Sequence, residues 1–175
     1  MLADAKVTAA YRNERFEFNG RADGLAQALR LVWRTDAFLA QVLYRAKARL
    51  QALGVPLLPR LAHVLAMVVA QVCIEDGALL HPGVYIAHGQ VVIVGNVEIH
   101  TGAVLFPWVT ISQCGADGGR TTIGPGAQIG TGSSVLGPVH LGASSRVGAN
   151  AVVVSDVPDG STAVGAPARI IAAGS

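Results

Sequence analysis

The 175-residue sequence predicts a mainly β protein, a parallel β-helix built from six-residue repeats that follows a short α-helical region. Three observations support this fold class. An aliphatic residue recurs at a period of six in the second half, apart from a one-residue slip before Ile93 and an interval of two repeats before Ile123. Glycines and other turn-forming residues follow most of these positions, and the first half has helical periodicity instead. We therefore divide the chain into an N-terminal helical region, residues 1–72, and a β-helix domain, residues 73–175, with a loop at 112–122 and a C-terminal tail.

Helical spacing of apolar residues runs from Thr35 to about Val72. Gly54 is expected to end a first helix, and the prolines that follow it to open a second. A shorter helix is expected around Leu25–Trp33, whereas the first twenty residues favour no element. The weakly charged run Leu61–Val72 is too short to cross a bilayer as a helix, and we expect it to form a buried helix.

The repeats after residue 73 are defined by an aliphatic anchor that starts each unit. Each unit is interpreted as one side of a three-sided coil, with the anchor inside and a tight turn at the corner. A small residue is expected inside the corner, four places after the anchor. The anchors are Ile74, Leu80, Ile86, Ile93, Ile99, Leu105, Ile111, Ile123, Ile129, Val135, Leu141, Val147 and Val153, and the small residues are Ala78, Ala103, Ala127, Ser133, Ser145 and Ala151.

Composition and charge restrict the class of protein. Hydrophobic residues make up 51% of the chain and charged residues 14%, which excludes a disordered chain and favours self-association. Because a short stack of coils has little core of its own, we expect a homotrimer in which neighbouring subunits cover one side.

Ten of the thirteen Lys and Arg residues lie in the first sixty positions. A solvated helical surface explains this distribution, and a weak association of the basic helices with an anionic membrane surface remains open. No nucleic-acid motif is present, so no nucleic-acid partner is expected. The two cysteines have no metal-type spacing and no signal peptide precedes the first charges, which predicts a cytoplasmic protein.

Four segments together resemble a known family. They are Ile86–Gly89, Gly118–Arg120 ahead of the next anchor, Asp156–Pro158, and the ending Val164–Arg169. With the unbroken repeats, they make residues 74–171 similar to the serine O-acetyltransferases and to the colanic acid and capsule O-acetyltransferases. The resemblance implies a left-handed β-helix that uses acetyl-CoA as cosubstrate, without a metal. It implies transfer of an acetyl group to a hydroxyl, either of L-serine or of a sugar in a polysaccharide.

The resemblance places the general base of the reaction at His88. A neutral imidazole can take a proton from the attacking hydroxyl and return it to the sulfur of CoA. The two carboxylates of the family fall at Cys73 and Ala87 in this sequence, so neither is present. Glu75 or the neighbouring Asp76 is the candidate that would orient His88 in their place, with Glu75 taken first, although exposure to solvent explains either residue equally well.

The resemblance also assigns the binding residues. Arg120 matches the arginine of the family's loop, and a bidentate contact with a carboxylate or an acidic sugar would suit it, together with Asp117 in the same loop. Trp108 either stacks on a sugar ring or fills a seam between subunits. The positions expected along CoA are Thr131, Arg146, Ala149 and Arg169.

Two alternatives remain open at this stage. One is a non-catalytic trimeric homologue that binds CoA, which the missing carboxylates suggest. The other is a zinc enzyme like the γ-type carbonic anhydrases, which resemble this fold. In those enzymes two zinc-binding histidines lie five residues apart on one chain, and the histidines here lack that spacing: His81, His88, His100 and His140.

Overall fold

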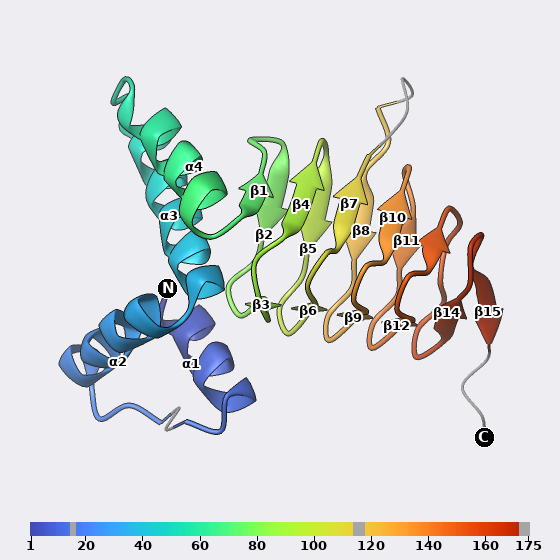
Figure 1. Ribbon diagram of the computed structural model, residues 1–175, viewed down its shortest axis with the longest axis horizontal. Helices are drawn as coiled ribbons and strands as arrows, with labels where there is room; N and C mark the ends of the chain where they lie inside the picture. The colour runs from blue at the N-terminus through green and yellow to red at the C-terminus, as the bar shows by residue number, and fades with distance from the viewer. Residues whose placement is uncertain (15–16, 114–117, 172–175) are drawn as a thin grey trace.

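The computed structural model describes residues 1–14, 17–113 and 118–171. Four helices stand at one end of a three-sided solenoid of parallel strands, and the coils of the solenoid follow one another along its length (Figure 1). The strands form three sheets, one on each side of the solenoid. The last coil lies at the end opposite the helices (Figure 1).

The helices are α1 (Leu2–Tyr11), α2 (Arg21–Arg34), α3 (Asp36–Ala52) and α4 (Leu58–Val69). The predicted break at Gly54 is confirmed, because that residue has a φ of +68° and lies between α3 and α4. The predicted short helix is longer than expected, and α1 forms where the sequence favoured no element. Among the described residues, no helix is long and apolar enough to cross a bilayer.

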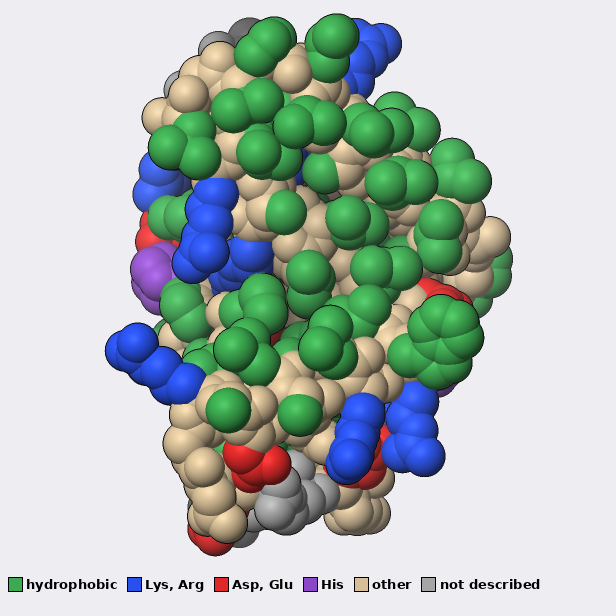
Figure 2. Space-filling view, turned by 90° about the vertical axis from the view of Figure 1, so that its left-hand side faces the viewer, with side chains coloured by type: hydrophobic (Ala, Val, Ile, Leu, Met, Phe, Trp, Pro, Cys, Tyr) green, Lys and Arg blue, Asp and Glu red, His purple; other side chains and the backbone are tan. Residues whose placement is uncertain are grey.

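The prediction that the run after Leu61 is a buried helix is wrong. Only Ala62 and Ala66 of α4 are buried, because the helix packs against α3 and the first coil through its small residues. Its larger side chains stay at the surface, where Val68 is 71% exposed. Figure 2 shows this end of the molecule, with many apolar side chains and scattered Lys and Arg.

Each side of the solenoid is one sheet. Sheet A contains β1 (Val72–Ile74), β4 (Val91–Val94), β7 (Thr110–Ser112), β10 (Ser134–Leu136) and β13 (Val152–Val153). Sheet B contains β2 (Ala78–Leu80), β5 (Val97–Ile99), β8 (Thr121–Ile123) and β11 (His140–Leu141). Sheet C contains β3 (Tyr85–Ile86), β6 (Val104–Leu105), β9 (Gln128–Ile129), β12 (Arg146–Val147), β14 (Thr162–Val164) and the antiparallel β15 (Arg169–Ile171).

The register of these sheets places the repeat anchors above one another. In sheet B, for example, Leu80 pairs with Ile99, Ile99 with Ile123, and Ile123 with Leu141. All thirteen anchors are buried, with at most 4% of each side chain exposed. The six small residues expected inside the corners are buried as well. The interpretation of the hexads as sides of a coil is therefore confirmed.

Buried polar contacts join the helices to the first coil. Arg45 of α3 donates from Nη1 to the carbonyl of Leu80 at 2.5 Å and from Nη2 to that of His81 at 3.0 Å. The same guanidinium lies 3.3 Å from the buried carboxylate of Asp4 in α1. Lys47 is almost fully buried and donates to the carbonyl of Ile74. The helices are thus fixed against the start of the solenoid.

Candidate functional site

One edge of the solenoid, where each coil passes from sheet C to sheet A, carries a row of equivalent residues. Each is the second residue after a sheet C anchor, and because these anchors pair in register, the row runs through His88, Pro107, Thr131 and Ala149. Two backbone hydrogen bonds of 2.9 Å, from Gly132 to Pro107 and from Asn150 to Thr131, join neighbouring coils at this edge. We call this row the C–A edge.

The first coil of the C–A edge opens into a pocket. His88 is exposed and lines an open pocket of about 420 Å³ together with Asp36, Gln71 and Trp108. Asp36 is the first residue of α3, and Trp108, on the same edge one coil further, has 63% of its surface exposed. The pocket therefore combines an imidazole, a carboxylate and an aromatic face.

A glycine allows this corner to approach the helices closely. A Cβ atom at Gly89 would collide with the backbone carbonyl of Ala70, which ends α4. The next residue, Gln90, donates its backbone N–H to the carbonyl of Gln71 at 2.8 Å. The Gly that follows His88 thus brings the histidine against the end of α4 and the start of α3.

Glu75, expected to orient His88, does not line this pocket. Gln71, which lines the pocket, precedes β1, whereas Glu75 follows the other end of this strand. The Glu75 carboxylate accepts a hydrogen bond from the N–H of Gly95. Cys73 lies within β1, and burial raises the pKa of its thiol, with the charge of Glu75 adding to this effect. A neutral thiol does not replace the missing carboxylate. Within one chain, Asp36 is the carboxylate that shares the pocket with His88.

Arg120 lies on a different side of the solenoid. It precedes β8 of sheet B and donates from Nη1 to Glu98 Oε2 at 2.5 Å and from Nε to Asn96 Oδ1 at 3.0 Å. Its guanidinium is therefore already bound to residues of its own chain.

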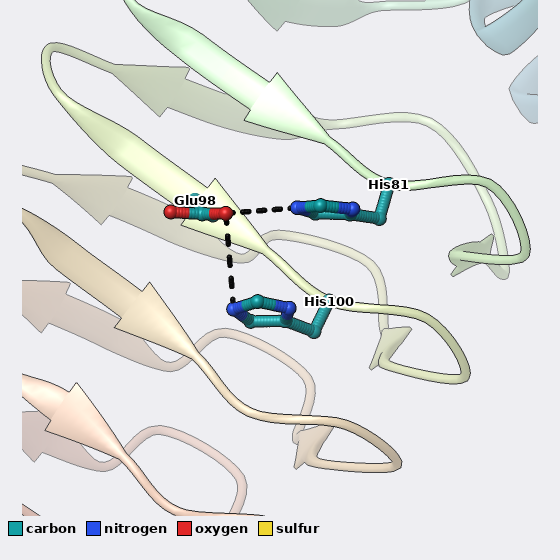
Figure 3. Close-up of side chains that lie close together, drawn as sticks. All are labelled: His81, Glu98 and His100. Carbon is teal, nitrogen blue, oxygen red and sulfur yellow. Dashed lines mark hydrogen bonds and ion pairs between the residues drawn. The ribbon is translucent and has the colours of Figure 1, made fainter.

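Glu98 also accepts from His81, at 2.8 Å from Nε2, and Figure 3 shows this contact. This hydrogen bond, helped by the one from Arg120, holds the pKa of the Glu98 carboxyl below its usual value, although desolvation acts in the opposite direction.

The remaining predicted residues are distributed as follows. Thr131 and Ala149 lie on the C–A edge with His88, whereas Arg146 is exposed on β12 of sheet C and Arg169 is exposed on β15 at the far end of that sheet. Trp108 is on the side of His88, away from Arg120. Asp117 lies outside the described residues. Within a single chain, the structure brings His88, Thr131 and Ala149 to one edge, but it does not bring Arg120 to them.

Sequence reasoning missed Asp36 and Glu98. Asp36 lies at the predicted start of the helical spacing, and nothing in its local sequence connects it with a histidine 52 positions away. A signal for Glu98 was present. Its neighbour His100 follows the anchor Ile99 just as His81 follows Leu80, so the two histidines are one coil apart.

Comparisons with known proteins agree with the repeat and the fold. Residues 120–155 match the family model described as bacterial transferase hexapeptide (six repeats). The chain is 34% identical over 137 residues to the serine acetyltransferase of Synechococcus elongatus, which covers 77% of this chain and 56% of that protein. It is 37% identical over 121 residues to the serine acetyltransferase of Mycobacterium tuberculosis, covering 67% and 53%. The chain thus spans about half the length of these curated relatives.

Solved structures show the same architecture. The crystal structure of Neisseria gonorrhoeae serine acetyltransferase in complex with serine superimposes with a TM-score of 0.78 at 26% identity, over 98% of this chain and 68% of that one. The structure of a Brucella abortus serine acetyltransferase in complex with coenzyme A gives a TM-score of 0.77 at 24% identity, over 98% and 66%. The predicted left-handed β-helix is therefore confirmed.

Proposed function

We propose that this chain, a hexapeptide-repeat relative of the serine acetyltransferases, transfers an acetyl group from acetyl-CoA to a hydroxyl with His88 as the general base. The observation that carries the proposal is the position of His88. It is an exposed imidazole in an open pocket, at the head of the edge that also holds Thr131 and Ala149. The sequence similarity to serine acetyltransferases supports the same reaction class.

The proposed reaction is a direct transfer. His88 removes the proton of the acceptor hydroxyl while the hydroxyl oxygen attacks the thioester carbonyl, and a tetrahedral intermediate forms. Collapse of this intermediate breaks the bond between carbon and sulfur, and the imidazolium returns the proton to the departing thiolate of CoA. Asp36 lines the same pocket and would stabilise the imidazolium that forms between the two proton transfers. Asp36 takes the part that the sequence assigned to Glu75.

The C–A edge offers a straight path for the pantetheine arm. Neighbouring coils of a parallel sheet are about 4.8 Å apart, so Ala149 lies about 14 Å from the coil of His88. Beyond His88 and the neighbouring Trp108, the row continues through Pro107, Thr131 and Ala149, whose short side chains an extended chain can follow closely. The exposed Arg146 and Arg169 lie on the outer side of sheet C, where they would meet the phosphates of CoA.

We propose that the acceptor site is completed by a second copy of the chain in a homotrimer. His88 lies on the C–A edge, whereas Arg120 lies on sheet B, so one chain does not offer both to the same small molecule. In a three-fold arrangement the C–A edge of one copy would face sheet B of the next. L-serine is the first acceptor to test, because a structural relative binds serine, and a sugar hydroxyl beside Trp108 is the second.

An assay of thiol release from acetyl-CoA, with L-serine and with a set of glycans as acceptors, tests the reaction. We expect acceptor-dependent thiol release by the wild type and a loss of about 10²- to 10⁴-fold in kcat for His88→Ala. His140→Ala removes another exposed histidine of the solenoid and is the matched control. Asp36→Asn should lower the rate by less than His88→Ala does, because it removes only the carboxylate that shares the pocket with the imidazole.

Equal thiol release by the wild type and His88→Ala would show that His88 is not the general base. Binding of acetyl-CoA without transfer to any hydroxyl would favour the non-catalytic homologue instead.

Mixed trimers test the proposed arrangement of subunits. His88→Ala and Arg120→Ala are each expected to be weakly active, but copies mixed at random should form a complete site at about a quarter of the interfaces. Refolding the two variants together should therefore restore about a quarter of the wild-type rate. No recovery in mixed trimers would show that His88 and Arg120 do not act in a shared site.

A further inference from the structure

Two histidines and a glutamate form a cluster on the outer side of sheet B, away from the His88 pocket (Figure 3). His81 follows β2 and His100 follows β5, and the pairing of Leu80 with Ile99 places them on neighbouring coils. Their rings are stacked with centroids 4.7 Å apart and an angle of 13° between planes. Glu98, on β5, points out of the sheet toward both rings.

The three side chains point their donor atoms at a common position. Nε2 of His81 lies 2.8 Å from Glu98 Oε1, and Nε2 of His100 lies 3.9 Å from the same oxygen. All three donor atoms are within 4.8 Å of one another. A tetrahedral zinc ion with bonds of about 2.0–2.1 Å needs donors about 3.3 Å apart, so small side-chain rotations suffice to bring all three to that spacing.

The residues around the cluster hold it in place. Arg120 binds the other oxygen of Glu98, Oε2, and this fixes the direction in which Oε1 points. A cation would therefore be bound through Oε1 alone and would share the carboxylate charge with the guanidinium. On the other side, Arg45 binds the backbone carbonyls of Leu80 and His81 and anchors the strand end that carries the first imidazole.

We propose that His81, Glu98 and His100 form a binding site for a divalent first-row transition metal, with zinc as its natural occupant. Two imidazole nitrogens and one carboxylate oxygen are a donor set that zinc uses where water or a substrate takes the fourth position. Within one chain the side chains of His81 and His100 are 36% and 38% exposed, so the fourth position would be open to water or to a ligand held between neighbouring copies. The ion would join the first coil to the second and would lie next to Arg120.

Zinc binding to the intact, tag-free chain tests the site, because a polyhistidine tag would itself bind zinc. The chain is treated with a chelator, dialysed, and titrated with Zn²⁺ in competition with a chromophoric indicator. We expect one zinc ion per chain. Glu98→Gln and His100→Ala should each weaken binding by about tenfold or more. His140→Ala is the matched control, because His140 is also exposed on sheet B but bonds to Thr122, and it should bind zinc like the wild type.

A second readout separates coordination from an effect on folding. Co²⁺ bound at a four-coordinate site gives visible absorption bands, and these bands should appear with the wild type and His140→Ala but not with His100→Ala. Glu98→Gln keeps the shape of the side chain, so its circular dichroism spectrum should match that of the wild type. The proposal fails if the wild type does not bind zinc at a ratio of one, or if Glu98→Gln and His100→Ala bind it as tightly as His140→Ala. Both readouts report binding alone and do not depend on acetyl transfer.

Discussion

The solenoid and the helical region bury their apolar residues in different ways. In the solenoid every repeat anchor is buried inside its own chain. In the helical region many large apolar side chains are exposed (Figure 2). Trp33, for example, has 92% of its surface exposed. The others include Leu25, Leu29, Leu53, Leu57, Leu58, Leu61, Val64, Leu65, Met67, Val68 and Val69.

This difference follows from how each region forms its core. A coil encloses its anchors on three sides and stacks them on those of the next coil, so the repeat completes its own interior. The helices meet the coil through small residues, as Ala62 and Ala66 do in α4, and the core that they form with one another is small, around Leu31 and Phe38. The apolar side chains that stay exposed on the helices would need a further surface to be buried. Within one chain most of the buried apolar core therefore lies in the solenoid, and the exposed helical surface contributes little to stability.

Truncation of a repeat anchor should have the largest effect on the free energy of unfolding. Ile123→Ala removes a fully buried side chain from the middle of sheet B and should lower the free energy of unfolding by about 2–5 kcal/mol. Urea denaturation at a fixed protein concentration measures this change. Val154→Ala, at an exposed position near the last coil, is the control. Equal effects of the two substitutions would contradict the assignment of Ile123 to the common core.

Removal of Arg45 tests the connection between the two regions. Arg45→Met takes the guanidinium away from the buried carboxylate of Asp4, which is left with the N-terminal ammonium of Met1, and it removes a donor from the carbonyls of Leu80 and His81, so we expect a loss of about 2–3 kcal/mol. Arg49→Met, at an exposed position of the same helix, is the matched control. Hydrogen exchange should increase in α1 as well as at the end of β2. An effect confined to α3 would show that Arg45 does not couple the regions.

A smaller, pH-dependent effect is expected from Asp76. A hydrogen bond from Lys47, at 2.8 Å, together with one from Gln51, holds the pKa of Asp76 below its usual value of 3.8. The folded state therefore binds this proton less readily than the unfolded state, so the pair stabilises the fold above that value and the contribution is lost as the pH falls below it. The Asp76 side chain is 71% exposed, so solvent screens the pair, and Asp76→Asn should cost less than about 1 kcal/mol near pH 7, with the difference from wild type decreasing below about pH 4. A difference that stays constant down to pH 3 would contradict this.

The smallest effect is expected on the exposed helical surface. Leu29 of α2 is 70% exposed, and Leu29→Ala should change the free energy of unfolding by less than about 0.5 kcal/mol. Thermal unfolding at two protein concentrations measures it. A loss comparable with that of Ile123→Ala, and dependent on concentration, would show that this surface is covered by another molecule in solution.

Much of the fold could be predicted from the sequence because the hexad period identifies the buried position in each unit. The anchor Ile99 is buried in register with Leu80 because the period sets the stacking, whatever the intervening residues are. The helices were harder to predict from the sequence. Residues of α1 have no marked periodicity, and α1 is held by contacts made elsewhere, such as the stacking of Tyr11 on Tyr85 of β3. The surface position of α4 was missed because a run of apolar residues does not reveal which face is packed.

The candidate site was predicted only where it follows the repeat. His88, Thr131 and Ala149 each follow a sheet C anchor by two positions, so they lie on one edge. Asp36 could not be assigned from local sequence, because it reaches the His88 pocket through the packing of α3 on the first coil. Glu98 was missed although the repeat carried a signal for it, since the stacking of coils places His81 and His100 on neighbouring coils. Glu75 is close to Cys73 in sequence, but β1 carries it away from His88.

A crystal structure of the chain with bound CoA would test most directly whether the C–A edge carries the chemistry. We expect the sulfur of CoA beside the His88 imidazole and the pantetheine arm along Pro107, Thr131 and Ala149. CoA bound along sheet B, with its sulfur near Glu98 and away from His88, would contradict the account.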